Sequence, residues 1–96
     1  MTKKGYVYIV GNQKPVIYIG VTSELEGRTW EHKNSIFKGF SSKYHTFKLL
    51  YYEEFESIED AIYREKQIKH WKRDWKLELI RVHNPLFKDL YNDLFE

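Results

Sequence analysis

The sequence predicts a small α+β domain in which a β-hairpin leads into a short helix, and a third strand leads into further helices. Two alternating apolar runs, residues 6–10 and 16–21, flank the turn-like segment GNQKP, which indicates a hairpin. Residues 47–55, FKLLYYEEF, are rich in aromatic and β-forming residues, which indicates a third strand. Helical spacing of apolar residues follows from residue 58 onward. With 96 residues and no linker or repeat, the chain is expected to fold as a single domain, residues 1–96.

Alternation along the hairpin sorts its side chains onto two faces of the sheet. One face carries aliphatic side chains, those of Val7, Ile9, Ile17, Ile19 and Val21. The other face carries Tyr6, Tyr8, Val10, Val16, Tyr18 and Gly20. A glycine within a strand leaves room for another group to approach the backbone. The tyrosine-bearing face is therefore the candidate functional site.

The hairpin leads into a predicted helix over residues 24–34, capped by Thr22 or Ser23 and weakened by Gly27. Arg28 and His32 lie four residues apart and therefore share one face of this helix. They occupy positions where a core helix usually places leucine or alanine. The inward stripe of the helix comprises Leu25, Arg28 or Thr29, His32 and Ile36.

Ser57 with Asp60 resembles a capping box, which predicts a helix over residues 58–71. The apolar stripe of this helix contains the carboxylate of Glu65. An ionised carboxylate on a packed face needs an ion pair, a hydrogen bond or a bound cation, because its desolvation is otherwise costly. Arg28 or a buried tyrosine would be a structural partner, whereas Mg²⁺ shared with substrate phosphate oxygens would be a functional one. The stripe comprises Ile58, Ala61, Ile62, Glu65 and Ile68.

After a break near Lys72, the sequence predicts a helix over residues 73–82. Asn84-Pro85 then opens a last amphipathic helix over residues 86–95. Its apolar side either closes the core of the domain or offers a face to a second copy or a protein partner. That side comprises Leu86, Phe87, Leu90, Tyr91, Leu94 and Phe95.

Residues 64–76, REKQIKHWKRDWK, form a basic stretch that is interleaved with Trp71 and Trp75. Such a stretch is either a solvated helix face or a surface that tracks the phosphates of a nucleic acid. Acidic residues gather elsewhere, in residues 53–60 and in the last helix, so the molecule has a basic side despite a formal net charge of only +2. The cations of the stretch are Arg64, Lys66, Lys69, Lys72, Arg73 and Lys76.

The composition excludes several kinds of site. The chain contains no cysteine, which excludes disulfides, a thiolate nucleophile and a cysteine-based zinc site. No apolar run approaches the length of a membrane span, and residues 1–5 precede a strand without the apolar region of a signal peptide. We therefore expect a cytoplasmic protein with no membrane partner. Aromatic residues make up 18% of the chain, and they serve either as buried area in a small core or as stacking platforms for bases.

Several motifs together resemble those of the GIY-YIG nuclease domain. They are Tyr6-Val7-Tyr8, Tyr18-Ile19-Gly20, Arg28 with His32 four residues later, and Glu65 on a following helix. The segments YIGVTSELEGRTWEH, LLYYEEF and REKQIKHW are most similar to the small stand-alone bacterial members, and the resemblance covers nearly the whole chain. It implies a three-stranded antiparallel sheet flanked by helices, in the order β-β-α-β-α-α with a C-terminal helix.

The resemblance also implies the roles of individual residues. Glu65 would hold one divalent ion, Mg²⁺ or Mn²⁺. Tyr8 would deprotonate or orient the attacking water, with Tyr18 as its hydrogen-bonding partner near the scissile phosphate. Arg28 would bind that phosphate, because its planar fork suits two phosphate oxygens. His32 could relay a proton, since the reference pKa of histidine is about 6.5.

Nucleic-acid contacts are expected from the loop after the first helix and from the basic stretch, namely from Lys43, Lys69, Lys72 and Arg73. Asn84 is a candidate accessory residue, because it matches an asparagine that some members carry near the end of the domain. The chain departs from the family pattern at two positions. Tyr6 replaces the first glycine, and Val21 stands where some members have a lysine directly after YIG, a contact that Lys43 could replace.

The sequence therefore predicts a metal-dependent endonuclease that hydrolyses phosphodiester bonds in DNA. Its action is expected to be structure-directed or weakly specific, on branched or damaged duplexes, in DNA repair or recombination, with RNA as a further substrate to be tested. The expected oligomeric state is a monomer or a weak homodimer. The alternative function is a non-catalytic nucleic-acid-binding or protein-interaction module on the same fold.

Overall fold

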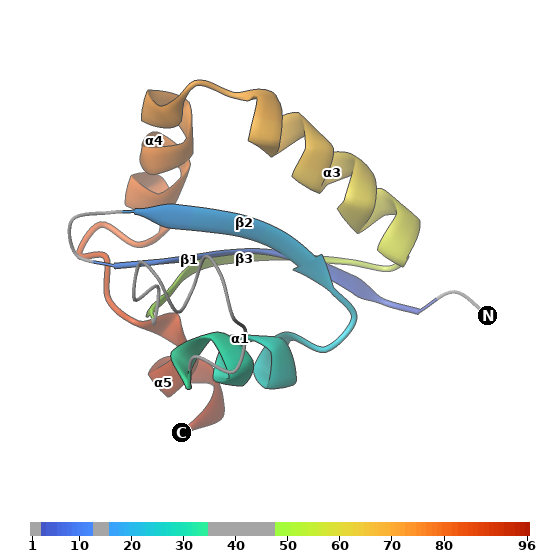
Figure 1. The fold of residues 1–96 in the computed structure, drawn as a ribbon, viewed down its shortest axis with the longest axis horizontal. Coiled ribbons are helices and arrows are strands. Elements are labelled where there is room, and N and C mark those ends of the chain that lie inside the picture. Colours follow the sequence, from blue (N-terminus) through green and yellow to red (C-terminus); the bar gives the residue numbers. More distant parts are fainter. Residues whose placement is uncertain (1–2, 13–15, 35–47) are drawn as a thin grey trace.

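The computed structural model describes residues 3–12, 16–34 and 48–96 of the chain. Its elements are β1 (Gly5–Gly11), β2 (Ile17–Thr22), α1 (Leu25–Lys33), β3 (Lys48–Phe55), α3 (Ile58–His70), α4 (Arg73–His83) and α5 (Leu90–Phe95). The strands form one antiparallel sheet in the order β2-β1-β3, so β2 lies at an edge. Helices α3 and α4 cover one face of this sheet, and α1 and α5 cover the other (Figure 1). The predicted α+β class, a three-stranded antiparallel sheet flanked by helices, is confirmed.

The face of the sheet toward α3 and α4 is aliphatic, as the alternation in the hairpin predicts. Val7 and Ile9 of β1 are fully buried on this side, where they pack with Ile68 of α3 and Ile80 of α4. Ile19 of β2 joins the same cluster. Burial of apolar surface stabilises this layer, at about 25 cal/mol for each Å² removed from water.

The face toward α1 and α5 carries the predicted tyrosines. Tyr8 and Val10 of β1 are buried in a cluster with Leu25 of α1 and Tyr91 of α5. Three further tyrosines pack against this cluster while remaining partly exposed, namely Tyr6, Tyr18 and Tyr52. The predicted division of the hairpin into an aliphatic and a tyrosine-bearing face is confirmed.

Helix α1 begins one residue later than the sequence predicts, at Leu25. The prediction that Thr22 or Ser23 is its N-cap is wrong, because the N-cap is Glu24 and that residue makes no side-chain cap. The Thr22 hydroxyl instead accepts a hydrogen bond from the backbone N–H of Glu24 at 3.0 Å. Ile36, the predicted end of the inward stripe, lies outside the described residues. The buried residues of α1 are Leu25, Thr29 and His32.

The corner between α3 and α4 forms where the sequence predicts a break. Ser57 caps α3, because its hydroxyl accepts from the backbone N–H of Asp60 at 3.2 Å. Trp71 and Lys72 have extended backbone conformations, which end α3 and start α4 in a new direction. The two helices therefore run in different directions over the same face of the sheet (Figure 1).

The last helix is shorter than predicted. A helix over residues 86–95 is wrong at its start, because α5 begins at Leu90. The Asn84 side chain accepts from the backbone N–H of Lys88 at 3.1 Å and donates to the Lys88 carbonyl at 2.8 Å. These two bonds hold the preceding segment in a turn, in which Phe87 has a φ of 51°. Helix formation is delayed because the side chain of Asn84 competes for these backbone groups.

The apolar side of the C-terminal segment mainly closes the core of the domain. Tyr91 is buried, and Leu90 and Phe95 pack partly exposed against the tyrosine-bearing cluster. Leu86 and Leu94 are the exceptions, with 84% and 41% of their surface exposed. None of the helices in the described part of the chain combines the length and apolar character that crossing a membrane requires.

Candidate active site

The hydroxyl of Tyr8 is the centre of a hydrogen-bonded cluster between β1 and α1. It lies 3.1 Å from Nε2 of His32, and Nε of Arg28 donates to it at 3.4 Å. Arg28 and His32 are four residues apart on α1, so one helix turn brings both side chains to the same hydroxyl. Tyr8 and His32 are buried, whereas Arg28 is only partly covered. The structure therefore brings three of the predicted site residues together.

Gly20 explains how the phenol of Tyr8 reaches α1. The two residues are direct partners in the pairing of β1 with β2. A Cβ atom at position 20 would lie 2.4 Å from Cζ and from the hydroxyl oxygen of Tyr8, which is closer than any real contact. The ring thus lies across the backbone of β2 in space that only a glycine provides. The predicted close approach to Gly20 is confirmed, and the approaching group is a side chain of the protein itself.

Tyr18 extends the cluster toward the edge of the sheet. Its ring centroid lies 5.4 Å from that of His32 and 6.4 Å from that of Tyr8. It stands two residues before Gly20 on β2, on the same face as Tyr8, and it is partly exposed. The two tyrosines and the histidine therefore form a continuous ring cluster from the buried centre of the sheet to its surface at β2.

The buried rings of this cluster are neutral at pH 7. Burial raises the pKa of Tyr8 to about 12, although the hydrogen bond from Arg28 lowers it in part. Burial, with the positive charge of Arg28 as the second cause, lowers the pKa of His32 to about 4. In the tautomer of neutral His32 that carries its proton on Nδ1, the phenol of Tyr8 donates to Nε2 while its oxygen accepts from Nε of Arg28.

Arg28 links this buried cluster to the surface. Its side chain is 39% exposed, and Nη1 lies 3.9 Å from Oε1 of Glu31. It also borders an open pocket of about 520 Å³, whose other lining residues are Thr22, Glu24, Gly27, Trp30 and Glu31. A guanidinium in this position can contact an anion in the pocket through its Nη atoms while its Nε remains bonded to Tyr8.

Glu65 approaches from the other side of the sheet. It belongs to α3, and it lies on the helix face that also carries the buried Ala61 and Ile68. Its side chain is only 13% exposed, and its Oε2 lies 3.3 Å from Nζ of Lys69 on the next turn. The prediction that this carboxylate sits on a packed face therefore holds, while its ion-pair partner is Lys69, which the sequence had not suggested. Ile62, also assigned to the stripe, is exposed at its border.

The donor set around Glu65 suits a cation that is held mainly by water and substrate. Within the described ranges, no group of three or more histidine, cysteine, aspartate or glutamate side chains could form a protein cage. Mg²⁺ commonly uses one or two carboxylates and completes its shell with waters and phosphate oxygens. A single, mostly buried carboxylate beside the sheet is compatible with that mode of binding.

The remaining predicted residues lie apart from the ring cluster. Asn84 is buried, and its amide donates to the backbone carbonyls of Leu50 and Lys88 at 3.1 and 2.8 Å. It therefore links α4, β3 and the segment before α5. Lys43 falls outside the described residues. The exposed cations at the α3–α4 corner are Lys69, Lys72 and Arg73.

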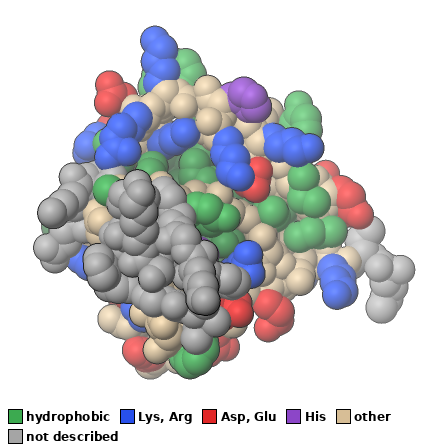
Figure 2. Space-filling model, viewed as in Figure 1, with side chains coloured by type: hydrophobic (Ala, Val, Ile, Leu, Met, Phe, Trp, Pro, Cys, Tyr) green, Lys and Arg blue, Asp and Glu red, His purple; other side chains and the backbone are tan. Residues whose placement is uncertain are grey.

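The basic side that the sequence predicts is visible on the surface. In Figure 2, Lys and Arg side chains gather over α3 and α4 in the upper part of the view. One cation of the basic stretch is directed elsewhere, because Arg64 forms an ion pair with Glu53 of β3 at 3.0 Å. Glu53 also accepts a hydrogen bond from the hydroxyl of Tyr51. The cluster of Tyr51, Glu53 and Arg64 was not predicted from the sequence, because its pattern there is only an acid two residues after a tyrosine.

Comparison with known proteins places the chain in a family. The family model described as the GIY-YIG catalytic domain matches residues 4–78. A UPF0213 protein of Staphylococcus saprophyticus is 32% identical over 77 residues, which cover 80% of this chain and 94% of the relative. A UPF0213 protein of Clostridium perfringens is 37% identical over 75 residues, which cover 78% of this chain and 81% of the relative.

The fold has a counterpart among solved structures. The solution NMR structure of a UPF0213 protein from Bacillus halodurans superimposes with a TM-score of 0.57 at 24% sequence identity. The superposition covers 90% of this chain and 92% of the other. At this level of identity the similarity concerns the fold alone.

Proposed function

Because this chain belongs to the GIY-YIG catalytic domain family, a family of nucleases, we propose that it is a divalent-metal-dependent endonuclease that hydrolyses DNA. The observation that carries this proposal is the buried Tyr8 hydroxyl, to which both an arginine and a histidine are hydrogen bonded. We place the activity in DNA repair or recombination in the cytoplasm, on branched or damaged duplexes, by a monomer or weak homodimer. The proposed catalytic residues are Tyr8, Tyr18, Arg28, His32 and Glu65.

Tyr8 and His32 are proposed to move the proton of the attacking water. The Tyr8 oxygen accepts that proton while the phenol passes its own proton to Nε2 of His32, 3.1 Å away. A phenol with a pKa of about 12 is rarely ionised at pH 7, so this paired transfer is preferable to a free phenolate. The negative charge of a bound phosphate raises the pKa of His32 and eases its protonation. The imidazolium can then return the proton to the leaving oxygen.

Arg28 and Tyr18 are proposed to position the scissile phosphate. The exposed part of the Arg28 guanidinium faces a pocket that can admit a phosphodiester, and it neutralises charge that grows in the transition state. Tyr18 stands at the surface end of the ring cluster, where its hydroxyl can bond to the same phosphate or to the attacking water. The ion pair of Arg28 with Glu31 is long, at 3.9 Å, and gives way to phosphate at low cost.

Glu65 is the proposed ligand of the divalent ion. When bound, Mg²⁺ or Mn²⁺ would supply Lewis acidity at the leaving oxygen and acidify water. Helices α1 and α3 cover opposite faces of the sheet, with the edge strand β2 between them (Figure 1). A phosphodiester at this edge would therefore meet Arg28 from one side and Glu65 from the other. Lys69 neutralises the carboxylate until the ion replaces it.

The basic surface is proposed to hold the flanking DNA. Lys69, Lys72 and Arg73 lie on the α3–α4 corner, on the helix that carries Glu65 and at its continuation, and Lys43 is proposed to add a contact. Asn84 has a positioning role in this proposal, because its amide is occupied by backbone groups.

The test uses labelled branched and linear DNA with the purified protein in Mg²⁺, Mn²⁺ or EDTA. We expect cleavage that needs the metal, that falls by at least about 100-fold in Tyr8→Phe, and that is lost in Glu65→Gln. Tyr63→Phe and Glu59→Gln make the same changes at exposed positions of α3, and they should cleave like the wild type. Labelled RNA serves as the competing substrate.

Two results would contradict the proposal. Undiminished cleavage by Glu65→Gln would show that this carboxylate has no role in metal binding. Salt-sensitive DNA binding without cleavage in any metal would favour the non-catalytic binding module instead.

A further inference from the structure

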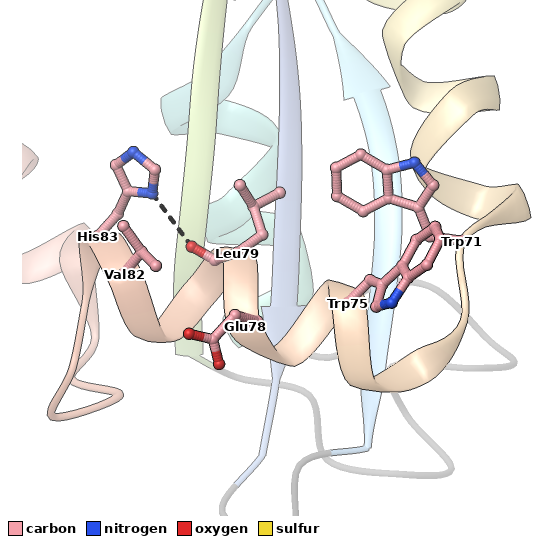
Figure 3. A pocket seen from close by; sticks show the side chains of 6 residues that line it. All are labelled: Trp71, Trp75, Glu78, Leu79, Val82 and His83. Carbon is pink, nitrogen blue, oxygen red and sulfur yellow. Dashed lines mark hydrogen bonds between the residues drawn. The ribbon is translucent and has the colours of Figure 1, made fainter.

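An apolar groove runs along α4 on the surface of the protein (Figure 3). It has a volume of about 330 Å³ and is lined by Trp71, Trp75, Glu78, Leu79, Val82 and His83. Figure 3 shows the two indoles at one end, the imidazole of His83 at the other and Leu79 between them. Trp75 is 55% exposed, which is unusual for so large an apolar side chain. The groove is comparable in size to small-ligand pockets and is open to solvent.

The tryptophan end of this groove is rigidly supported. The two indoles pack edge to face, with centroids 6.3 Å apart and ring planes at 74°. The guanidinium of Arg64 lies 5.1 Å from the ring centroid of Trp71. Arg64 is itself fixed by two bonds to Glu53, of 3.0 and 3.1 Å. The arrangement presents preformed aromatic surface to the solvent, at little entropic cost for a ligand that stacks on it.

The charges around the groove favour a phosphate-bearing ligand. Lys72 and Arg73 lie between the two tryptophans in the chain and are exposed at the α3–α4 corner. Lys76 follows Trp75 directly and reaches back toward this corner, where its Nζ donates to the Lys69 carbonyl at 3.2 Å. The acid in the lining, Glu78, forms an ion pair with Arg81 and points away from Leu79 (Figure 3).

We propose that the groove is a stacking site for an unpaired base of the nucleic acid that this protein cuts. The proposal rests on the proposed function and specifies its substrate as a duplex with an adjoining single-stranded segment. Stacking on Trp75 requires a free base face, which an intact duplex does not offer. The cations at the corner then contact the phosphates of the same strand. Glu65 belongs to α3, and Trp71, which lines the groove, directly follows the last residue of that helix.

The experiment measures binding of three labelled DNAs in EDTA, so that its outcome does not depend on cleavage. The DNAs are an oligothymidine, a blunt duplex and the same duplex with a single-stranded overhang. We expect Trp75→Leu, which keeps an apolar side chain but removes the ring, to weaken binding of the oligothymidine and the overhang duplex by at least about fivefold. Binding of the blunt duplex should stay unchanged.

Three further variants make the interpretation specific. Trp75→Phe retains a ring and should restore most of the lost affinity. Tyr63→Leu removes a ring from α3 that is more exposed than Trp75 and lies outside the groove, and it should bind all three DNAs like the wild type. Lys72→Gln should weaken binding of all three DNAs alike, because it removes a phosphate contact.

The proposal is overturned if Trp75→Leu binds the oligothymidine as tightly as the wild type does. It is also overturned if Trp75→Leu leaves DNA binding intact and abolishes self-association in sedimentation, which would assign the groove to a second copy of the chain. Neither result bears on metal-dependent cleavage of branched DNA. Conversely, absence of cleavage with intact base stacking would refute the proposed catalysis alone.

Discussion

On the α3–α4 side of the sheet the buried side chains are aliphatic apart from Tyr51, whereas on the α1–α5 side the phenol of Tyr8 and the imidazole of His32 are buried together. The central strand β1 contributes to both sides, with Val7 and Ile9 on the first and Tyr8 on the second. The first side is stabilised by removal of apolar surface from water. The second must also satisfy the hydrogen bonds of Tyr8 and His32, because a buried polar group without a partner costs about 1–3 kcal/mol.

This difference separates the side chains of the aliphatic core, which stabilise the fold, from those of the ring cluster, which belong to the proposed active site. In the described part of the chain, no buried side-chain nitrogen or oxygen is left without a hydrogen bond. The tyrosine-bearing side therefore forms without an orphaned group, but it holds His32 in a neutral state that acid can disturb. Substitutions in the aliphatic core should mainly change stability, whereas those in the ring cluster or at Glu65 of α3 should also change activity.

The largest expected change in stability comes from a substitution on the aliphatic side of the sheet. Ile68→Ala removes a fully buried side chain from the α3 layer and should lower the free energy of unfolding by about 2–5 kcal/mol. Activity per folded molecule should change far less, because Ile68 is not one of the proposed catalytic residues. Urea unfolding measures the first quantity and cleavage at low temperature the second. Ile62→Ala, at an exposed position of the same helix, is the matched control and should cost far less.

A somewhat smaller change in stability is expected from acid, through His32 on the α1–α5 side of the sheet. The pKa of His32 is about 4 in the folded protein and about 6.5 in the unfolded chain, so the unfolded chain binds the proton first. Above pH 6.5 the imidazole is neutral in both states. As the pH falls from 6.5 to 4, protonation of the unfolded chain lowers the free energy of unfolding by up to about 3 kcal/mol. Urea unfolding of the wild type and of His32→Gln between pH 4 and 6.5 measures the contribution of His32 to the free energy of unfolding, because the other titrating groups are the same in both proteins.

His70→Gln is the control for this titration, since His70 is exposed on α3. It should follow the wild-type pH dependence. If His32→Gln loses stability with acid as steeply as the wild type does, the imidazole is not held neutral in the fold, and the hydrogen-bond direction from Tyr8 to His32 is wrong.

The smallest expected effect compares two glycines. Gly20→Ala forces a methyl group against the buried Tyr8 ring and should cost about 1–3 kcal/mol and most of the cleavage activity. Gly27→Ala makes the same change on α1, where the added carbon meets nothing within 4 Å beyond the adjacent residues and the backbone of its own helix, and should stabilise the helix by about 0.5–1 kcal/mol. Thermal unfolding of both variants, with cleavage assays, checks the contrast. Equal effects of the two substitutions would mean that Tyr8 does not need the space above Gly20.

Much of the candidate site could be predicted because it follows from local periodicity. The period of two in the hairpin places Tyr8, Tyr18 and Gly20 on one face, and helical spacing places Arg28 and His32 on one side of α1. The position of Glu65 in a packed stripe follows from the same rule. Its pairing with Lys69 is also local, yet periodicity does not specify which of several neighbours a carboxylate selects.

Contacts between distant segments could not be predicted in this way. The start of α5 depends on Asn84, whose amide bonds to the carbonyl of Leu50 on β3 as well as to Lys88. The groove along α4 depends on the corner at Trp71, which places an indole at the end of the groove opposite His83 (Figure 3). Sequence spacing alone describes neither of these arrangements.

By itself, the sequence determined the strands and helices, the faces on which their side chains lie, and the residue types available for chemistry, because these depend on interactions between near neighbours in the chain. The tertiary structure decided which of those residues meet. It brought Arg28 and His32 onto one hydroxyl, turned Arg64 toward Glu53, and left Trp75 exposed in a groove. These outcomes depend on how the helices pack on the sheet, and that packing is fixed by the burial of the whole apolar surface.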